Sequence, residues 1–454
     1  MGASSATATS ARHLAVAAAL LALIPSARAE GESQAGGDAE PAYRKYLPSP
    51  TLPMGGGARG GEGGATRIDN PGADISAERM GVTMDFPEWL REALGKPKPA
   101  STAAPETGAR QITWAPYITV SPLVGVGFGV GLAGTRQRGD VETTRISKFS
   151  GSVLVTTEKQ YSVPFRTDIT LPGGDWNLVG LWKWANFPSP TYGIGGNTPD
   201  SAKTTIDYQL LRFYEIINRR IFTNFYLGAG YRLDYYFNMK DQAAGTGRIT
   251  DFQQYPYGTG ATSLNSSLAA NVLYDSRDSP VFATRGFYAN LSYAFTPKFL
   301  GSDTTWQTMY LDLRTYLRLA RPLVLGLWSY GWVNFGEVPY LELPSIGSDP
   351  DARSGRGYIE GRHIGKALLY GEVELRYTVW EWLGAVASFN VHSVAEPGQQ
   401  GILSDEPRFQ YWWPSVVIGA RILAVKATHS NIAIDYAWGK NGSSGLYFNF
   451  AEAF

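Results

Sequence analysis

From Gln111 to the end of the chain, apolar and polar residues alternate with a period of two. In residues 304–320, one face of the expected strand carries Leu311, Leu313, Leu317 and Leu319, and the other carries Asp312, Arg314, Tyr316 and Arg318. Residues 371–377 show the same alternation. Successive side chains of a β-strand point to opposite sides of the sheet, so this pattern predicts strands with one apolar and one polar face.

The alternating segments predict about sixteen strands. The average length of a strand together with its connection suits a strand that spans a membrane. They lie near residues 114–121, 125–137, 144–157, 160–171, 175–187, 203–217, 222–238, 261–275, 286–298, 304–319, 322–336, 366–380, 384–396, 408–424, 430–439 and 444–454. Two folds compete for this pattern. A soluble sandwich puts the apolar faces inside, whereas a transmembrane barrel turns them toward lipid and encloses the polar faces.

The connections between the strands distinguish these two folds. Long connections, at 188–202, 239–260, 337–365 and 397–407, alternate with short ones such as 172–174, 320–321 and 381–382. Long loops on one rim and tight turns on the other are typical of outer-membrane barrels whose N-terminus is periplasmic. The sequence therefore predicts an all-β fold, a 16-stranded antiparallel transmembrane barrel over residues 111–454.

Aromatic residues gather near the ends of the expected strands, as at Trp380, Trp382, Trp412 and Trp413. Amphipathic rings of this kind form the interfacial girdles of membrane barrels. The chain also ends on an aromatic residue, Phe454, as the last strand of such barrels does. These features favour the barrel over a soluble core.

The first 110 residues differ from the rest. A charged start, an apolar run at 14–24 and the small residues before Ala29 predict a secretory signal peptide over 1–29. Residues 30–110 hold 14 glycines and 9 prolines, a composition that predicts a disordered low-complexity arm in the periplasm. Within it, residues 86–94 form an expected short helix with one apolar face. This helix either docks on another surface or is a transient element of the tether. The sequence favours the transient element.

Composition excludes several classes of protein. Forty basic residues balance forty acidic ones, so the chain lacks the excess of positive charge that is typical of nucleic-acid-binding proteins. The chain has no cysteine, and its four histidines lack metal-ligand spacing. No residue pattern identifies a catalytic nucleophile, so we expect no enzyme, no metal site and no cofactor.

The longest connection leads to the most specific pattern. It contains Arg356, Gly357 and Tyr358, and it enters a strand that carries Glu372 and Glu374. With the turn at 275–288 and the last hairpin at 434–454, it resembles the bacterial surface antigen and outer-membrane assembly superfamily, the BamA/TamA type. Members carry an Arg-Gly-Phe/Tyr tip on the loop between strands 11 and 12, which matches Arg356-Gly357-Tyr358.

The resemblance implies that this loop folds into the lumen and that Arg356 meets acidic side chains on strands 12 and 13. Glu374 matches the strand-12 partner, and Glu372 is its neighbour on the same face. The family's strand-13 motif, Phe-x-Asp, is matched here by Phe389-Asn390-Val391. We therefore expect Val391 to replace the usual acid, which makes the attachment of the loop weaker or transfers it to another residue.

Two further expectations concern the start of the barrel. The arm lacks the pattern of a periplasmic POTRA module, so the chain resembles a barrel-only branch of the family. Strand 1 holds Pro116 and Pro122, and proline cannot donate to a strand ladder. We therefore predict a weak lateral seam between strand 1 and strand 16, which ends at Phe454.

These features predict a bacterial outer-membrane barrel that assists the insertion or translocation of proteins or lipids. Its expected partners are outer-membrane lipids, unfolded outer-membrane or secreted proteins, and the barrel assembly machinery that inserts it. The alternative is a passive channel or structural barrel without assembly activity.

Overall fold

The structure is a computed structural model that describes residues 86–94, 110–121, 125–140, 143–279, 282–350, 353–395, 409–425 and 430–450. The expected signal peptide at 1–29 and most of the expected arm at 30–110 lie outside these residues. Pro122 and Phe454 also lie outside them.

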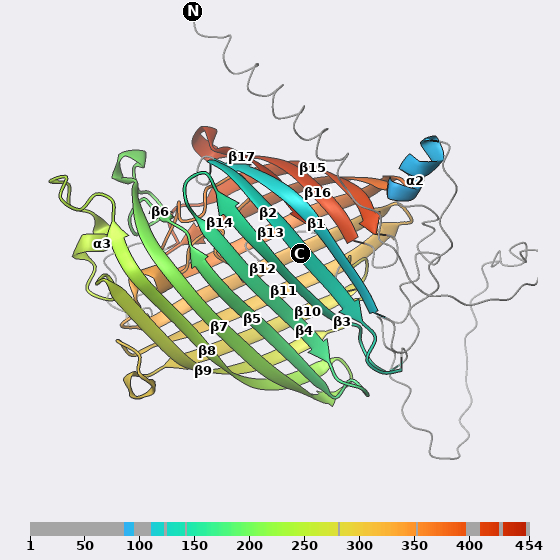
Figure 1. The fold of residues 1–454 in the computed structure, drawn as a ribbon, viewed down its shortest axis with the longest axis horizontal. Helices are drawn as coiled ribbons and strands as arrows, with labels where there is room; N and C mark the ends of the chain where they lie inside the picture. The colour runs from blue at the N-terminus through green and yellow to red at the C-terminus, as the bar shows by residue number, and fades with distance from the viewer. Residues whose placement is uncertain are drawn as a thin grey trace, which may run out of the picture.

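The described residues form an all-β fold in which one antiparallel sheet wraps into a barrel (Figure 1). Its strands are β1 (Arg110–Ser121), β2 (Gly125–Arg136), β3 (Ser147–Thr156), β4 (Tyr161–Thr170), β5 (Trp176–Asn186), β6 (Ser189–Thr191), β7 (Thr204–Phe222), β8 (Phe225–Asp241), β9 (Thr262–Asp275), β10 (Gly286–Thr296), β11 (Trp306–Ala320), β12 (Leu323–Gly336), β13 (Ala367–Trp380), β14 (Leu383–Val394), β15 (Trp413–Val425), β16 (Ser430–Gly439) and β17 (Ser444–Phe450).

Neighbouring strands in the wall follow chain order, and each pairs antiparallel with the next. The three-residue strand β6 pairs with β7 beyond the end of β5, which also pairs with β7. Because β5 and β6 share one place in the wall, the 17 strands of the sheet make 16 wall positions. The predicted 16-stranded antiparallel barrel is confirmed.

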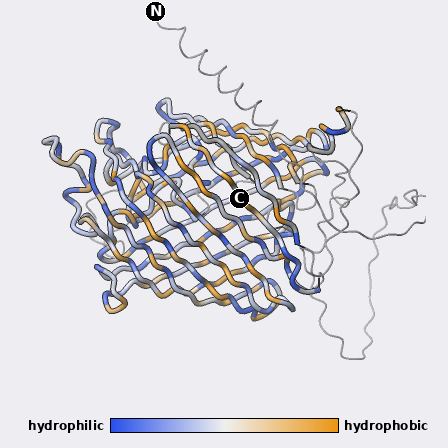
Figure 2. Tube along the Cα trace, viewed as in Figure 1, coloured by the Kyte–Doolittle hydropathy of each residue, from blue (hydrophilic) through white to orange (hydrophobic). Residues whose placement is uncertain are grey.

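The wall reproduces the alternation seen in the sequence. On β13, for example, Val373 and Leu375 are exposed on the outside, whereas Glu372 and Glu374 are buried on the lumenal side. Figure 2 shows apolar and polar residues interleaved along the strands. The main deviation from the predicted bounds is β7, which continues to Phe222 and delays the next turn.

Few helices accompany the barrel in the part of the chain that the structure describes. They are α2 (Phe86–Ala93), α3 (Asp251–Gln254) and the short 3-10 helices η3 (Asp200–Ala202), η4 (Lys298–Leu300), η5 (Tyr340–Glu342) and η6 (Lys440–Gly442). Among the described residues, no helix is long and apolar enough to cross a membrane. Helix α2, at the place of the expected short helix, lies at the short-turn end of the barrel (Figure 1), where the Trp89 ring packs against Trp382 at a tilt of 31°, with ring centroids 4.6 Å apart.

The long loops pack together at the other end of the barrel. A buried apolar cluster there joins strand ends to η5, α3 and the base of the connection between β12 and β13; its members are Ile206, Leu210, Tyr236, Met239, Phe252, Trp306, Val338, Tyr340, Leu343 and Ile364. Burial of large apolar side chains is the main favourable term in folding. The long β12–β13 connection is thereby fixed at its base, which positions its tip.

Candidate functional site

The candidate site is built on the connection between β12 and β13, which we call the lumenal loop (residues 337–366). Its two arms are joined near the base, where Ser345 bridges Ile364, and Ile364 also accepts a backbone hydrogen bond from Gly195 at 2.7 Å. Nearer the tip, Asp349 accepts hydrogen bonds from the backbone of Arg353 and Ser354 at 3.1 and 2.8 Å. These bonds hold the chain in the turn that presents the tip to the lumen.

The tip motif has a geometric requirement at Gly357. Its φ is +106°, a backbone conformation that residues with a Cβ rarely adopt. A Cβ at this position would also lie 2.9 Å from the Cβ of Ser415 on β15. Glycine therefore allows the tip to approach the wall closely, which brings the neighbouring Arg356 among the lumenal side chains.

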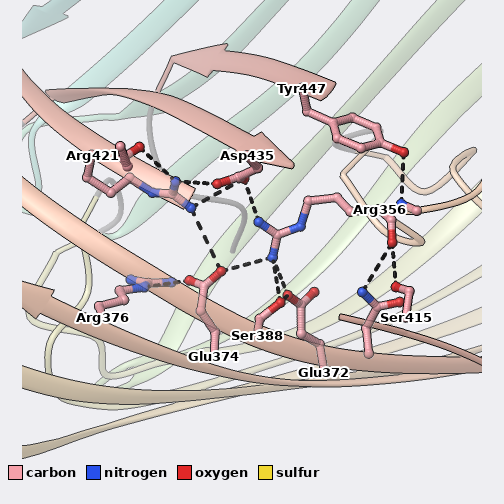
Figure 3. A network of polar contacts seen from close by, with 12 residues as sticks. Arg356, Glu372, Glu374, Arg376, Ser388, Ser415, Arg421, Asp435 and Tyr447 are labelled. Carbon is pink, nitrogen blue, oxygen red and sulfur yellow. Dashed lines mark hydrogen bonds and ion pairs between the residues drawn. The ribbon is translucent and has the colours of Figure 1, made fainter. Parts of the chain in front are cut away.

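Arg356 is buried, with 2% of its surface exposed, and its guanidinium contacts three carboxylates (Figure 3). Nη2 contacts Glu372 and lies 2.9 Å from Glu374 Oε2, and Nη1 lies 2.6 Å from Asp435 Oδ2. The backbone oxygen of Arg356 accepts hydrogen bonds from Ser415 Oγ and Asn390 Nδ2. Both the charge and the main chain of the tip are thus held by lumenal side chains.

Two further arginines complete the network. Arg376 Nε donates to Glu374 Oε1 at 2.7 Å, and Arg421 Nη1 donates to Asp435 Oδ1 at 2.5 Å. Three guanidinium groups therefore face three carboxylates, and the set is neutral overall. A buried charge is tolerated only where it is paired and hydrogen-bonded, so we infer that each member of this network depends on the others.

Tyr358 extends the contacts of the tip to the end of the chain. Its hydroxyl donates to the carbonyl of Pro414 at 2.6 Å and accepts from the backbone of Lys440 at 2.8 Å. Beside it, Gly357 donates its backbone N–H to the hydroxyl of Tyr447 at 2.9 Å, and its carbonyl accepts from Ser443 Oγ at 2.6 Å. The tip is thus attached to β15, β17 and the connection between β16 and β17.

A pair of histidines lies against the ring of Tyr358. His363 Nδ1 and His392 Nε2 are 2.8 Å apart, and both side chains are fully buried. Burial, together with the proximity of His392 and Arg362, lowers the pKa of His363 to about 2. His363 is therefore neutral at physiological pH, and its bond to His392 joins the loop to β14 without adding charge.

The structure brings together five of the sequence-predicted residues: Arg356, Gly357, Tyr358, Glu372 and Glu374. The two parts of the expectation about Val391 have different outcomes. The attachment is transferred to another acid, Asp435 on β16, but Val391 does not occupy the lumenal position. Phe389 is 49% exposed on the outer face of β14, and Asn390 is the buried lumenal residue next to it. Val391 shares the outer face with Phe389 because side chains alternate along the strand. The uncharged side chain at the lumenal position is therefore Asn390.

Sequence reasoning missed two charged members of the network, Arg421 and Asp435. The alternation of residues 371–377 already places Arg376 in the same row as Glu372 and Glu374. Asp435 lies between Ile434 and Tyr436 in an alternating segment, so the pattern was sufficient to place it in the lumen. The alternation did not show that Asp435, on β16, supplies the third carboxylate for Arg356. Pro116 lies in β1.

The comparisons with known proteins agree with this architecture. Residues 186–402 match the Omp85 superfamily domain, and no curated protein matches the chain. Among solved structures, CdiB from Escherichia coli is similar with a TM-score of 0.51 and 10% identity, over 77% of this chain and 63% of that one. BamA from Haemophilus ducreyi, lacking POTRA domains 1–3, is similar with a TM-score of 0.48 and 15% identity, over 76% and 70%. The match of residues 186–402 confirms the predicted resemblance to this superfamily.

Proposed function

We propose that the chain, whose residues 186–402 match the Omp85 superfamily domain, assists the insertion or translocation of proteins, or of lipids, at the bacterial outer membrane. In this proposal it acts without enzymatic chemistry. Its partners are outer-membrane lipids and unfolded outer-membrane or secreted proteins, and the barrel assembly machinery inserts it. The arm lies in the periplasm, and substrates pass along a seam between β1 and β17.

The observation that carries the proposal is the attachment of the loop tip beside this seam. Gly357 contacts Tyr447 on β17, the last strand, through a backbone hydrogen bond. Within the described residues, β1 pairs with β2 and β17 pairs with β16, and no register joins β1 to β17. A loop that holds the last strand from inside is in a position to control whether this boundary opens.

The edge of β1 supports a weak seam. Pro116 lies opposite Val130 in the β1–β2 register. The carbonyl of Val126 accepts a bond from Thr157, at the start of the β2–β3 ladder. Successive residues of a strand turn their backbone N–H and C=O groups to opposite neighbours. Val130 lies four residues after Val126, so its backbone groups also point toward β3 and not toward β1. The nitrogen of Pro116 therefore faces away from β2, toward the seam, where proline offers no N–H to a neighbouring strand.

The packing of the long loops favours this function over a passive channel. At that end, the apolar cluster around Tyr340 and Phe252 is buried, and the lumenal loop crosses the interior as far as β16. An open aqueous pore needs a lumen free of such packing. We therefore expect little steady conductance from the purified protein in a planar bilayer.

The test uses a disulfide across the seam, in a chain that has no native cysteine. Val120→Cys with Leu446→Cys joins β1 to β17. The full chain is reconstituted in liposomes, and the folding rate of an urea-unfolded outer-membrane barrel protein is measured by its heat-modifiable mobility on gels. The reduced protein is expected to accelerate folding, and oxidation is expected to abolish the acceleration.

The control joins two strands that are already paired. Tyr436→Cys with Leu446→Cys uses the same position on β17 and its register partner on β16, so oxidation there leaves the seam free. Equal acceleration by the seam-locked and reduced proteins would exclude lateral opening. Steady pore currents without any acceleration would favour the passive channel.

A further inference from the structure

A carboxylate lies on the outer face of the barrel, far from the lumenal loop. On β7, Leu211, Phe213 and Ile217 are exposed on this face, and Glu215 belongs to the same row because side chains alternate along a strand. The neighbouring residues of β7 face the lumen, where Arg212 forms an ion pair with Asp234 at 2.5 Å. Glu215 therefore points toward the lipid.

The depth of Glu215 places it inside the hydrocarbon region. Four residues further along the same outer row lies Arg219, an exposed basic residue whose guanidinium lies 5.1 Å from the centre of the Trp176 ring. A basic residue beside a tryptophan is typical of the membrane–water interface, so this pair marks the edge of the apolar band. With a rise of about 3.3 Å per residue and a strand tilt of about 40°, the four residues from Arg219 to Glu215 correspond to about 10 Å in an apolar band about 25 Å tall. Among the described strands, the other carboxylates face the lumen or lie near strand ends.

The wall is shaped around this carboxylate. Trp182 Nε1 donates a hydrogen bond to Glu215 Oε1 at 2.8 Å. Gly180 lies opposite Glu215 in the β5–β7 register, and a Cβ at Gly180 would come within 2.6 Å of Oε1 and of Thr167 Oγ1. The absence of a side chain at Gly180 thus leaves room for the carboxylate. We call Glu215, Trp182, Gly180 and Thr167 the outer-wall notch.

Aromatic rings flank the notch. The ring of Trp182 stacks on Phe213 with centroids 6.0 Å apart and packs against Phe165 at 5.5 Å. In the part of the chain that the structure describes, no basic side chain lies within ion-pair distance of Glu215. A carboxylate in lipid is unfavourable without a partner, and intramembrane ionisable residues usually mark functional sites. The missing partner of Glu215 is a cation.

We propose that the outer-wall notch is a lateral docking site for a membrane-embedded protein segment that presents a lysine or arginine. Lipid headgroups lie at the two interfaces, so they do not reach a carboxylate near the middle of the apolar band. A long basic side chain on a partner protein does reach it, with its aliphatic stem along the wall and its charge beside the aromatic rings. This site is independent of the seam and of the lumenal loop.

The test is photo-crosslinking of the full chain in intact outer membranes. A benzoylphenylalanine is placed at Ile217, which neighbours Glu215 on the outer face, in the wild-type background and with Glu215→Gln. Removal of one member of a desolvated charge pair weakens binding by more than about tenfold. We expect an adduct whose partner segment spans the membrane and carries a lysine or arginine near the crosslink, and we expect Glu215→Gln to remove it.

The control places the same photoreactive residue at Met309, an exposed outer-face position on β11, where no such adduct is expected. Heat-modifiable mobility verifies that each variant is a folded barrel. Once the partner residue is located, Glu215→Lys combined with the reverse substitution in the partner is expected to restore the adduct. An adduct unaffected by Glu215→Gln, or crosslinks to lipid alone, would overturn the proposal.

Discussion

The lumenal loop buries carboxyl groups in two regions, which differ in how the charge is compensated. At the tip, Glu372, Glu374 and Asp435 are neutralised by arginines, with N···O distances of 2.9 Å or less. Near the base, Glu342 is only 7% exposed, and burial, followed by the nearby Asp234, raises its pKa to about 8. A buried carboxyl group requires either a guanidinium or a proton.

This difference has a functional meaning. The attachment of the tip depends on complete ionic geometry, so loss of one member leaves the others as uncompensated charges. The base depends on apolar packing around Tyr340 and on protonation of Glu342. The tip is therefore sensitive to displacement, as a control element of the proposed seam has to be, whereas the base is sensitive to pH.

Substitution at the centre of the tip network is expected to have the largest effect. Arg356→Ala leaves three carboxylates with only two arginines, and breaking a buried ion pair in this way costs about 3–5 kcal/mol. Urea unfolding of the protein in lipid vesicles measures the loss. Arg356→Lys is the matched variant, and it is expected to recover only part of the stability because an ammonium lacks the planar fork of the guanidinium. Full recovery by lysine would show that charge alone fixes the tip.

At the base, a pH dependence is expected. The pKa of Glu342 in the folded chain, about 8, lies above its ordinary value of 4.5. Between these values the folded chain keeps a proton that the unfolded chain has released, so stability is full below about pH 4.5 and declines as pH rises to about 8. From pH 5 to pH 7 the decline amounts to about 2–3 kcal/mol at 1.36 kcal/mol per unit.

Glu342→Gln removes this titration and is expected to flatten the dependence of the unfolding midpoint on pH. The control is Glu337→Gln, because Glu337 belongs to the same loop but its side chain is 43% exposed. An unchanged pH profile in Glu342→Gln would mean that Glu342 is ionised in the folded protein and paired after all.

The sequence was sufficient for the wall and for part of the tip. Strict alternation identified sixteen strands and the lumenal faces of Glu372 and Glu374, because a period of two determines which face a residue occupies. It does not determine which residues of distant strands meet across the lumen. Asp435 and Arg356 are 79 positions apart, and their contact depends on the depth to which the loop enters.

The error at Val391 has a related cause. Matching a family motif by its phenylalanine assigned the acid position to Val391, although a one-residue shift exchanges the two faces of a strand. The alternation of β14 itself, with Phe389 outside and Asn390 inside, gives the correct position. Glu215 was equally visible in the alternation of β7, where it interrupts an apolar row.

The smallest effect is expected where the lumen is open to water. Lys148 and Asp168 pair at 3.6 Å on neighbouring strands, and both side chains are 36% exposed. Because water screens such a pair, Lys148→Ala is expected to change stability by about 0–1 kcal/mol, less still at high salt. Urea unfolding at low and high ionic strength measures this change beside that of Arg356→Ala. A loss of stability as large as that caused by Arg356→Ala would show that water is excluded from this side of the lumen as it is from the ionic network. Exposed and buried lumenal charges would then not differ.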